Sequence, residues 1–598
     1  MAFQLRDQPV LVLGHGISGQ AMARWCMRLG ARVTVADTRL QIELMQRLQT
    51  ELDDLARQVT THTVGDDGVP AVVCAPFDDA LMARQTWAAV CKSPGLSPAQ
   101  LQVVADWATA RGVPVLGELD LFADGLRRVY ANAGFAPKVL AITGTNGKTT
   151  TTSLTGQLLS RAGMRVAVAG NIGPAMLDVL AEAADVEQKS APAQNHVSVT
   201  ATDSINQGPI VSPTHEADTP VVAPDANANA DAPDASVAEL EVSTSTLPQV
   251  WVLELSSFQL DGVRTGPNGF EPTAGTVLNV TQDHLDWHGS MAHYAAAKNR
   301  VYGQSGLRVL NREDATVMAA QPAAPEPVRK PRGAAAVAAL SAEPAAQPVP
   351  WVTFGTDVPR RPGDWGLEVV NGMAWLVRAQ AADETRLKRK ATQAAEDVVL
   401  QRLMPAEALR IRGRHNAANA LAALALATTA GASLAPMLYG LREYAGEPHR
   451  VSSVAIINGV EFIDDSKGTN VGATLAAIRG LGADRRLVMI MGGEGKGQDF
   501  SPLADAVRAH VNAVVLIGRD APAIRAALAA TGVPLLDAPD LTSAVHTAAE
   551  QAHEGDVVVM SPACASLDMF RNYSHRAEVF CAAVDELAIE VGMLGGQA

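Results

Sequence analysis

The chain has 598 residues, of which 47% are hydrophobic and 19% are charged, and its formal net charge is −15. Such a mixture is typical of globular proteins with large cores, and the length predicts about three domains. No basic stripe or tail accompanies the acidic charge, so specific nucleic-acid binding is not expected.

The five cysteines are widely spaced and form no CxxC pair. This pattern argues against a disulfide framework or a zinc site and favours a reduced, cytoplasmic protein. The N-terminal residues lack the apolar core of a signal peptide, and the longest apolar segment, NAANALAALALATTAGASLA, is rich in alanine and opens with asparagines. We therefore expect a buried helix at this segment and no membrane insertion.

The first predicted elements are a strand, a glycine-rich turn and a helix. Residues 10–25, VLVLGHGISGQAMARW, contain the pattern Gly14-x-Gly16-x-x-Gly19. This pattern is the fingerprint of a dinucleotide-binding turn, so NAD is a candidate ligand. The stretches ARVTVADTR, AVVCAPF and VPVLGELD continue the alternation of strands and turns. Together they predict a parallel α/β domain over residues 1–136.

A second glycine loop opens the next α/β unit. The stretch KVLAITGTNGKTTTTSLTGQLL consists of a strand, a loop and a helix, which is the context that a phosphate loop requires. Backbone N–H groups of residues 144–148 would surround phosphate oxygens, Lys148 would contact the β- and γ-phosphates, and Thr149 would bind Mg²⁺. The loop departs from the strict phosphate-loop pattern because Ile142 occupies the position of its first glycine.

Polar residues follow the later strands of this unit. Glu254 ends the apolar strand WVLE, and His284 lies in an acidic turn after TVLNV, ahead of Lys298 in YAAAKNR. Read alone, Glu254 fits a solvated strand end as well as a Mg²⁺ ligand. His284 likewise fits a polar turn as well as a second metal site, and Lys298 fits a plain surface lysine.

Two segments, residues 185–249 and 319–350, are rich in Ala and Pro and show no periodicity. We expect both to be flexible insertions in a central domain of residues 137–447, with partner binding as the alternative. The stretches RRLVMIMGGEGKG, AVVLIGRD and DVVVMSPACAS predict a third α/β domain over residues 448–598.

In their order, the motifs of this chain resemble those of the Mur ligase family. They are GTNGKTT, LELSSFQL, NVTQDHLDWHGS, GRHNAANALAALAL, GEPHR, DDSKGTN, GGEGKGQDF and SPACASLDMF, and the resemblance extends over about residues 10–587. It implies three α/β domains: a Rossmann-like N-terminal domain, a central P-loop ATPase-like domain and a Rossmann-like C-terminal domain. It also implies a cytoplasmic, monomeric ligase that uses ATP and Mg²⁺.

The resemblance implies the following reaction. ATP phosphorylates the carboxylate of UDP-N-acetylmuramoyl-L-alanine, the amine of D-glutamate attacks the acyl phosphate, and the tetrahedral intermediate collapses to an amide and phosphate. The motifs DDSKGTN and SPACASLDMF favour D-glutamate over the amino acids of sister ligases. Two alternatives remain open: a sister ligase for another amino acid, and an NAD-dependent oxidoreductase suggested by the first glycine turn.

The resemblance assigns roles to individual residues, beginning with the nucleotide and the metal. The ATP site would comprise Gly144, Thr145, Asn146, Gly147, Lys148, Thr149, Thr150, Asn419, Arg450 and Asp465. The metal ligands would be Thr149, Glu254, His284 and Lys298, the last as a carbamate. The catalytic residues would be Lys148, Glu254, His284, Lys298 and Lys467.

The two other substrates would have their own residues. The UDP substrate would contact Gly16, Ile17, Ser18, Gly19, Thr38, Arg39, Ser93, Asn171 and His284, so the first glycine turn would hold a diphosphate of UDP. D-glutamate would contact Lys467, Thr469, Lys496, Ser566, Leu567 and Tyr573. The family is expected to have phenylalanine at the position of Tyr573, so the contact of this residue with D-glutamate is an open point. Read without the resemblance, Ser93 belongs to an ordinary Ser-Pro-Gly turn.

Overall fold

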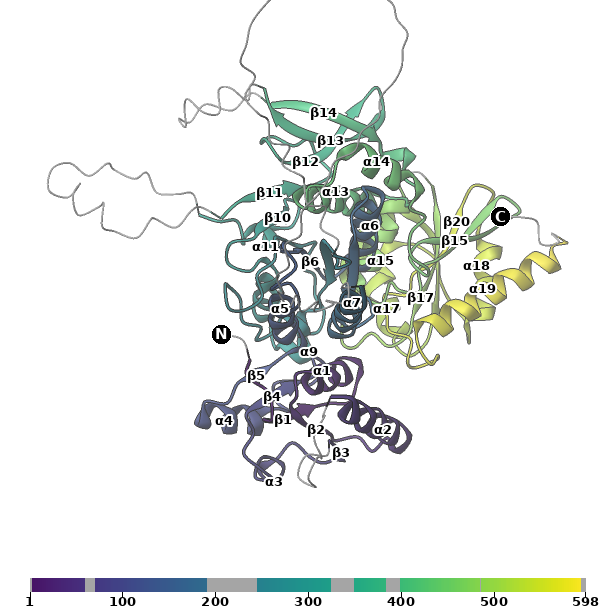
Figure 1. The fold of residues 1–598 in the computed structure, drawn as a ribbon. Coiled ribbons are helices and arrows are strands. Elements are labelled where there is room, and N and C mark those ends of the chain that lie inside the picture. The colour runs from purple at the N-terminus through teal and green to yellow at the C-terminus, as the bar shows by residue number, and fades with distance from the viewer. Residues whose placement is uncertain are drawn as a thin grey trace, which may run out of the picture.

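The computed structural model describes residues 3–59, 70–190, 245–323, 349–382, 398–483 and 485–592. Three β-sheets follow one another along the chain, and each is flanked by helices. In Figure 1 the N-terminal unit lies at one end of the central unit, and the C-terminal unit lies beside the central one. The fold is therefore α/β with three sheet-based units, as predicted.

The N-terminal sheet has five parallel strands in the order β3-β2-β1-β4-β5. The strands are β1 (Pro9–Leu13), β2 (Arg32–Asp37), β3 (Ala71–Cys74), β4 (Ala89–Lys92) and β5 (Val115–Leu116). The helices are α1 (Ile17–Arg28), α2 (Ile42–Val59), α3 (Asp79–Met82) and α4 (Gln102–Arg111). The chain moves outward from β1 on one side and returns to β4 on the other, so the strand order reverses at the carboxyl end of β1. Ligands of open α/β sheets bind at such reversal points, and here the predicted glycine turn occupies it.

The central sheet has nine strands in the order β14-β13-β12-β11-β10-β9-β6-β8-β7. The strands are β6 (Lys138–Thr143), β7 (Val166–Gly170), β8 (Val250–Glu254), β9 (Ala274–Val277), β10 (Leu307–Asn311), β11 (Trp351–Phe354), β12 (Trp365–Val370), β13 (Met373–Ala381) and β14 (Val398–Pro405). Strands β6 to β12 pair in parallel, whereas β13 is antiparallel to both β12 and β14. The sequence did not lead us to expect this antiparallel extension, because its strands carry no motif.

The helices of the central unit cover the faces of its sheet. They are α5 (Glu118–Val129), α6 (Lys148–Arg161), α7 (Met176–Ser190), α8 (Ser257–Leu260), α9 (Leu285–His288), α10 (Met291–Asn299), α11 (Ala315–Met318), α13 (Arg414–Thr429) and α14 (Leu434–Glu443), with the 3₁₀ helices η2 (Arg300–Tyr302) and η3 (Ala406–Ala408). The alanine-rich segment forms α13, whose residues 416–427 are all buried, which confirms the predicted buried helix. Within the described ranges, no helix combines the length and apolar character needed to cross a bilayer.

The two low-complexity segments are shorter than expected where the structure describes their ends. Helix α7 continues to Ser190, Leu247 is buried, and Ala320 packs in the core. The expected insertion boundaries at residues 185, 249 and 319 therefore include ordered residues, because apolar contacts, the ion pair of Asp185 with Arg28 of α1 and the hydrogen bonds of Thr246 to Glu187 hold them in place. The remaining parts, residues 191–244 and 324–348, lie outside the described residues.

The C-terminal sheet has six strands in the order β15-β16-β20-β17-β18-β19, and all neighbours except β15 and β16 are parallel. The strands are β15 (Ser452–Ile457), β16 (Val460–Asp464), β17 (Leu487–Gly492), β18 (Val511–Ile517), β19 (Leu535–Asp537) and β20 (Val557–Met560). The helices are α15 (Val471–Leu481), η4 (Ser501–Leu503), α16 (Ala504–His510), α17 (Ala521–Leu528), η5 (Ala529–Thr531), α18 (Leu541–Gln551) and α19 (Tyr573–Glu590). Strand β17 is buried along its whole length, as expected for a parallel strand covered on both faces.

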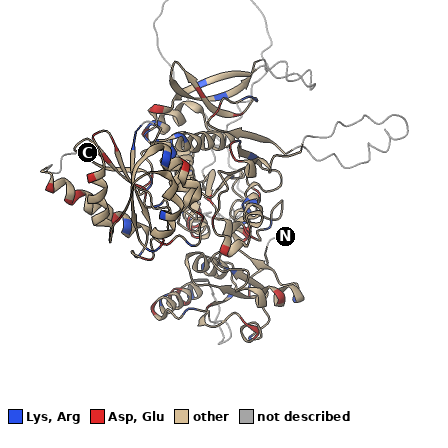
Figure 2. Cartoon of the chain, turned by 180° about the vertical axis from the view of Figure 1, so that it is seen from behind, with Lys and Arg blue, Asp and Glu red and all other residues tan. Residues whose placement is uncertain are grey.

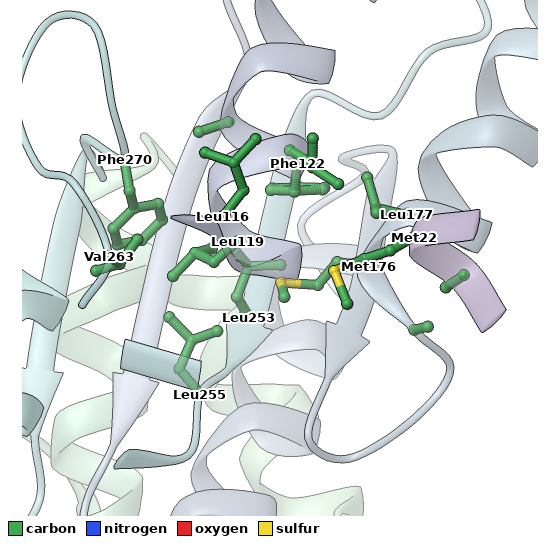
Figure 3. Close-up of a cluster of buried hydrophobic side chains, with 14 of the residues drawn as sticks. Met22, Leu116, Leu119, Phe122, Met176, Leu177, Leu253, Leu255, Val263 and Phe270 are labelled. Carbon is green, nitrogen blue, oxygen red and sulfur yellow. The ribbon is translucent and has the colours of Figure 1, made fainter. Parts of the chain in front are cut away.

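One hydrophobic cluster continues from the N-terminal unit into the central one (Figure 3). It contains Met22 of α1, Phe122 of α5, Leu177 of α7 and Leu253 of β8. The ring of Phe122 meets that of Trp251 edge-on, with 5.1 Å between centroids. The two units thus share apolar side chains as well as a connecting segment.

Candidate active site

A cleft of about 670 Å³ lies where the carboxyl ends of the central strands face the C-terminal unit. Strands β7, β8, β6 and β9 are neighbours and parallel, so the loops that follow them emerge at one edge of the sheet. The cleft lining includes Thr145, Asn146, Gly147, Lys148, Thr149, Asn171, Glu254, His284, Arg450, Lys467, Thr469, Lys496 and Tyr573. Residues predicted for three different ligands are therefore brought together.

The phosphate loop connects β6 to α6 and is shaped by glycines. Gly147 has a φ of +81° and precedes α6, and a Cβ added there would lie 2.6 Å from the Asn419 side-chain oxygen. Lys148 Nζ donates to the carbonyl oxygens of Gly144, at 2.9 Å, and Thr145, at 2.8 Å. Burial lowers the pKa of Lys148. The ammonium is thus folded over its own loop, where backbone N–H groups and a helix N-terminus favour an anion.

Glu254 presents an unused carboxylate oxygen in the cleft. The residue is 1% exposed, and its Oε1 accepts a 2.7 Å hydrogen bond from Asn171 Nδ2. Its Oε2 is buried and has no hydrogen-bond partner among the described residues. An orphaned buried carboxylate oxygen is costly unless a cation or a donor meets it.

The donor set fits a hard cation that also takes oxygens from a bound nucleotide. Glu254 and the Thr149 hydroxyl both offer oxygen, the donor type that Mg²⁺ prefers. Across the described ranges, no group of three or more His, Cys, Asp and Glu side chains is placed to hold a metal by itself. Mg²⁺ usually keeps waters and phosphate oxygens as ligands, so two protein oxygens are consistent with it.

Lys298 lies beneath the phosphate loop, on α10. It is 1% exposed, its Nζ donates to the Gly144 carbonyl at 2.8 Å, and it lies 4.4 Å from the centre of the Tyr294 ring. Burial lowers its pKa well below the ordinary value, and the Lys148 ammonium lowers it further. Lys298 is therefore not the solvated surface lysine that its helix suggests, and its burial favours the uncharged form of the amine.

His284 lies at the rim of the cleft rather than in its floor. It caps α9 with a φ of +52°, and its ring meets Phe258 edge-on at 4.7 Å. Burial lowers the pKa of the imidazole, so its neutral form, which can accept a proton or a metal, is favoured.

A smaller cavity of about 80 Å³ adjoins the phosphate loop on the side of α13. It is lined by Thr150, Asn419, Arg450 and Asp465, together with Gly147 of the loop. Asp465 accepts a 2.6 Å hydrogen bond from the Ser561 hydroxyl, and burial raises its pKa to about 7. Arg450 donates to the Thr149 hydroxyl at 2.6 Å, so the C-terminal unit reaches the phosphate loop here.

Four of the six residues predicted for D-glutamate line the cleft. They are Lys467, Thr469, Lys496 and Tyr573. Lys467 Nζ lies 3.6 Å from the centre of the Tyr573 ring. Burial would raise the pKa of the Tyr573 phenol, but the charge and hydrogen bond of Lys467 lower it overall. Ser566 is buried and Leu567 is 63% exposed, and neither lines the cavity.

The other residues predicted for the UDP substrate lie apart from the cleft, at the carboxyl edge of the N-terminal sheet. They are Gly16, Ile17, Ser18, Gly19, Thr38, Arg39 and Ser93, whereas Asn171 and His284 line the cleft itself. A Cβ at Gly19 would lie 1.9 Å from the Gly14 carbonyl, so the turn requires glycine there.

Asp37 shows why this turn is a poor NAD site. Its carboxylate accepts hydrogen bonds from the His15 backbone N–H at 3.0 Å and from the Arg39 Nε and guanidinium NH2, both at 3.0 Å. Both oxygens are thus engaged, whereas the acidic residue of a dinucleotide site must accept from a ribose hydroxyl. Burial opposes ionisation of Asp37, but the bonds from Arg39 and His15 lower its pKa to about 2.

The sequence interpretation did not single out three cleft residues, His449, Asn470 and Gln498. His449 and Asn470 lie within the quoted motifs GEPHR and DDSKGTN, so motif membership was the available signal. Gln498 follows Lys496 by two positions within the quoted motif GGEGKGQDF, so motif membership was the available signal here too, and its tertiary contacts give it its role.

The parts of the chain that carry the phosphate loop and the cleft lysines match models of one family of ligases. The family model of the Mur ligase middle domain matches residues 142–205 and 221–332, and that of the Mur ligase glutamate ligase domain matches residues 449–564. The chain belongs to the Mur ligase family.

Within the family, the chain is similar to curated enzymes along nearly its whole length. It is 52% identical over 594 residues to the UDP-N-acetylmuramoylalanine--D-glutamate ligase of Albidiferax ferrireducens, covering 98% of each chain. It is 46% identical over 678 residues to the enzyme of that name from Polaromonas sp., covering 99% of each, and 49% identical over 598 residues to that of Burkholderia mallei, covering 98% of this chain and 99% of the relative. Membership of a ligase family excludes the oxidoreductase alternative.

Proposed function

We propose that this protein joins D-glutamate to UDP-N-acetylmuramoyl-L-alanine, with hydrolysis of ATP to ADP and phosphate. One observation supports this most directly: a phosphate loop, an orphaned carboxylate oxygen on Glu254 and the two lysines Lys467 and Lys496 line one cleft. Similarity to D-glutamate ligases over nearly the full chain points the same way. A cytoplasmic, monomeric enzyme of peptidoglycan precursor synthesis is the corresponding cellular assignment.

The nucleotide would bind with its phosphates on the loop of residues 144–150 and its base toward Asn419. Lys148 would leave the Gly144 and Thr145 carbonyls and contact the β- and γ-phosphates. Mg²⁺, held by Thr149 and Glu254 with His284 nearby, would neutralise charge on the transferred phosphoryl group. Arg450 and Asp465 would contact the nucleotide from the C-terminal side.

Lys298 would act from beneath the loop. The uncharged amine is the form that reacts with carbon dioxide, and the lowered pKa of Lys298 favours that form. The resulting carbamate would give an anionic oxygen ligand in place of a repelling ammonium. We assign this modification as part of the proposal.

The acceptor amine would come from D-glutamate bound to the C-terminal unit. Its two carboxylates require cationic partners, and Lys467, Lys496 and the neighbouring Thr469 are placed to supply them. Ser566 and Leu567 would complete this subsite from the adjacent loop, and Tyr573 would orient Lys467. The donor carboxylate would reach the cleft past Asn171, with its UDP on residues 16–19 and on Thr38, Arg39 and Ser93.

Under this proposal, each of the three domains binds a different ligand. We propose a UDP-substrate domain of residues 1–136, an ATP-binding domain of residues 137–447 and an amino-acid-binding domain of residues 448–598. Because the three ligands contact different units, closure of the units around the substrates is expected before reaction.

The test is ADP release in the presence of UDP-N-acetylmuramoyl-L-alanine, ATP and Mg²⁺, with D-glutamate compared with L-glutamate, L-alanine, L-lysine and meso-diaminopimelate. We expect release with D-glutamate only. Lys148→Ala should lower this rate by about 10³-fold or more, because it removes the cation that meets the developing phosphate charge. Release with another amino acid would assign the chain to a sister activity, and no release with any of them would reject the proposal.

A further inference from the structure

Two asparagines join the central and C-terminal units at the cleft. Asn146 Nδ2 donates to Asn470 Oδ1 at 3.3 Å, and Asn470 Nδ2 donates to Asn146 Oδ1 at 3.2 Å. Asn146 is fixed within the phosphate loop, because its N–H donates to Asn279 Oδ1 at 2.9 Å and its carbonyl accepts from Asn279 Nδ2 at 3.1 Å. A shift of Asn146 must therefore move Asn470 or break two hydrogen bonds.

Asn470 is also hydrogen-bonded to the start of α15, so a movement of Asn470 would affect this helix end. Its Oδ1 also accepts from the Ala473 N–H at 2.9 Å, which makes Asn470 the N-cap of this helix. The next N–H, of Val471, donates to Gln498 Oε1 at 3.0 Å. The N-terminus of α15 is thus tied to a side chain on a different loop.

Gln498 connects the N-terminus of α15 to its own loop, which follows β17, and to the loop that follows β20. Its Nε2 donates to the carbonyls of Gly495, at 3.0 Å, and Ala563, at 3.5 Å. Between Gly495 and Gln498 lies Lys496, which has a φ of +53°. This conformation is unfavourable for lysine, so the surrounding contacts must hold it.

We propose that Asn470 and Gln498 are positioning residues that couple the phosphate loop to the placement of Lys496. Occupation of the loop by nucleotide and binding of an amino acid at Lys496 would then strengthen each other. Such coupling is reciprocal, because linkage requires each ligand to change the affinity of the other by the same factor. The inference rests on the proposed function, since it takes ATP and D-glutamate as the two ligands.

The experiment measures a thermodynamic cycle by calorimetry on the full-length protein. The dissociation constants of a non-hydrolysable ATP analogue with Mg²⁺ and of D-glutamate are each determined with and without the other ligand. In the wild type we expect the analogue to lower the dissociation constant of D-glutamate about fivefold or more. D-glutamate should lower that of the analogue by the same factor.

Two variants remove different hydrogen bonds between the phosphate loop and the loop of Lys496. Asn470→Ser keeps a side-chain oxygen as N-cap for α15 but removes both hydrogen bonds to Asn146 without adding a charge beside the phosphate loop, and Gln498→Met removes all three hydrogen bonds of the amide. In each we expect the mutual tightening to fall below about twofold, while the analogue alone binds within about twofold of the wild type. The control is Gln380→Met, whose exposed amide pairs with Gln401 on β14 and should leave the cycle unchanged.

The thermodynamic cycle distinguishes a positioning role of Gln498 from a direct contact of its side chain with D-glutamate. A direct contact of Gln498 would weaken D-glutamate equally with and without the analogue, and that result would overturn the inference. Full coupling in both variants, or independent binding of the two ligands in the wild type, would also overturn it and leave the proposed function intact. The proposed function itself would be rejected by the ADP-release assay, if the wild type released no ADP with D-glutamate and both other substrates present.

Discussion

Two buried lysines share one acceptor beneath the phosphate loop. Lys148 and Lys298 both donate to the carbonyl oxygen of Gly144. Two ammonium groups this close repel each other where little water screens them, so burial and mutual repulsion both favour loss of a proton. Lys298 is the more deeply buried member, and its strongly lowered pKa sets it apart from an ordinary helix lysine.

The Tyr573 hydroxyl can be tested by Tyr573→Phe. The aromatic ring beside Lys467 would remain, and the hydrogen bonds of the hydroxyl with Lys467 and Ser574 would be lost. A bond of this kind is worth about 1–3 kcal/mol, so we expect the KM for D-glutamate to rise by at most about 100-fold with kcat within about threefold. Steady-state kinetics with varied D-glutamate provide the measurement. A fall in kcat of more than about 100-fold would instead give the hydroxyl a part in the chemistry.

Asp465 makes stability depend on pH. In the unfolded chain its carboxyl is ionised above the ordinary pKa of 3.8, whereas burial in the folded protein raises the pKa to about 7. The folded protein therefore binds the Asp465 proton more tightly than the unfolded chain does. The free energy of unfolding should fall by up to about 4 kcal/mol as the pH rises from about 4 to about 7.

Asp465→Asn should remove this slope while keeping an acceptor for Ser561. Urea unfolding at pH 5, 6, 7 and 8 would compare the variant with the wild type. The exposed Asp505→Asn, on α16, is the control and should behave as the wild type does. Parallel stability curves for Asp465→Asn and the wild type would contradict the expectation.

Among the elements, α7 connects two units by two kinds of contact. Leu177 lies in the apolar cluster shared with α1 and α5 (Figure 3). The adjacent Asp178 accepts hydrogen bonds from Arg24 of α1 at 3.0 and 2.8 Å. Arg28 and Asp185 form a second ion pair between the same two helices. The ion pairs lie on partly exposed surface, where screening weakens them, so the apolar contacts should dominate the attachment.

Substitution of the two neighbours on α7 measures this difference. Leu177→Ala leaves a cavity in a fully packed region and should destabilise the protein by about 2–5 kcal/mol. Asp178→Ala should cost about 1 kcal/mol or less, because its pair is partly solvated. Urea unfolding, followed by tryptophan fluorescence, would give both changes in the free energy of unfolding. Equal changes would contradict the expectation that the apolar contacts dominate the attachment.

At the scale of the whole molecule, charge is spread over all three units. Acidic and basic segments are interspersed in the view of Figure 2. Charge therefore does not separate the units, and the cleft forms instead where loops at the carboxyl ends of central strands meet loops of the C-terminal unit.

The segment of residues 191–244 lies between two described ends that meet. Glu187 Oε2 accepts from the Thr246 backbone N–H at 2.6 Å and from its hydroxyl at 2.7 Å. A short Gly/Ser linker can therefore replace residues 191–244 without moving α7 or β8. We expect kcat to stay within about threefold of the wild type in the ADP-release assay, because neither end lines the cleft. A loss of more than about tenfold, with α7 intact by thermal melting, would give the segment a role in catalysis.

The sequence by itself determined the α/β class, the buried helix α13 and the phosphate loop, because each depends on residues that are close together in the chain. Hydrophobic runs of strand length, glycines in turns and a Gly-Lys-Thr at a helix start have local physical causes. The same reasoning could not separate NAD from UDP at the first turn, since both present a diphosphate to the same backbone N–H groups.

The tertiary structure decided which of these residues meet and in what electrostatic state. The orphaned oxygen of Glu254, the lowered pKa of Lys298 and the hydrogen bond from the His15 N–H to Asp37 all depend on neighbours or burial that the local sequence does not show. Gln498 is the clearest case, because its amide contacts come from residues 471, 495 and 563. Desolvation and hydrogen bonding act through space, and only the packed chain brings such residues within their range.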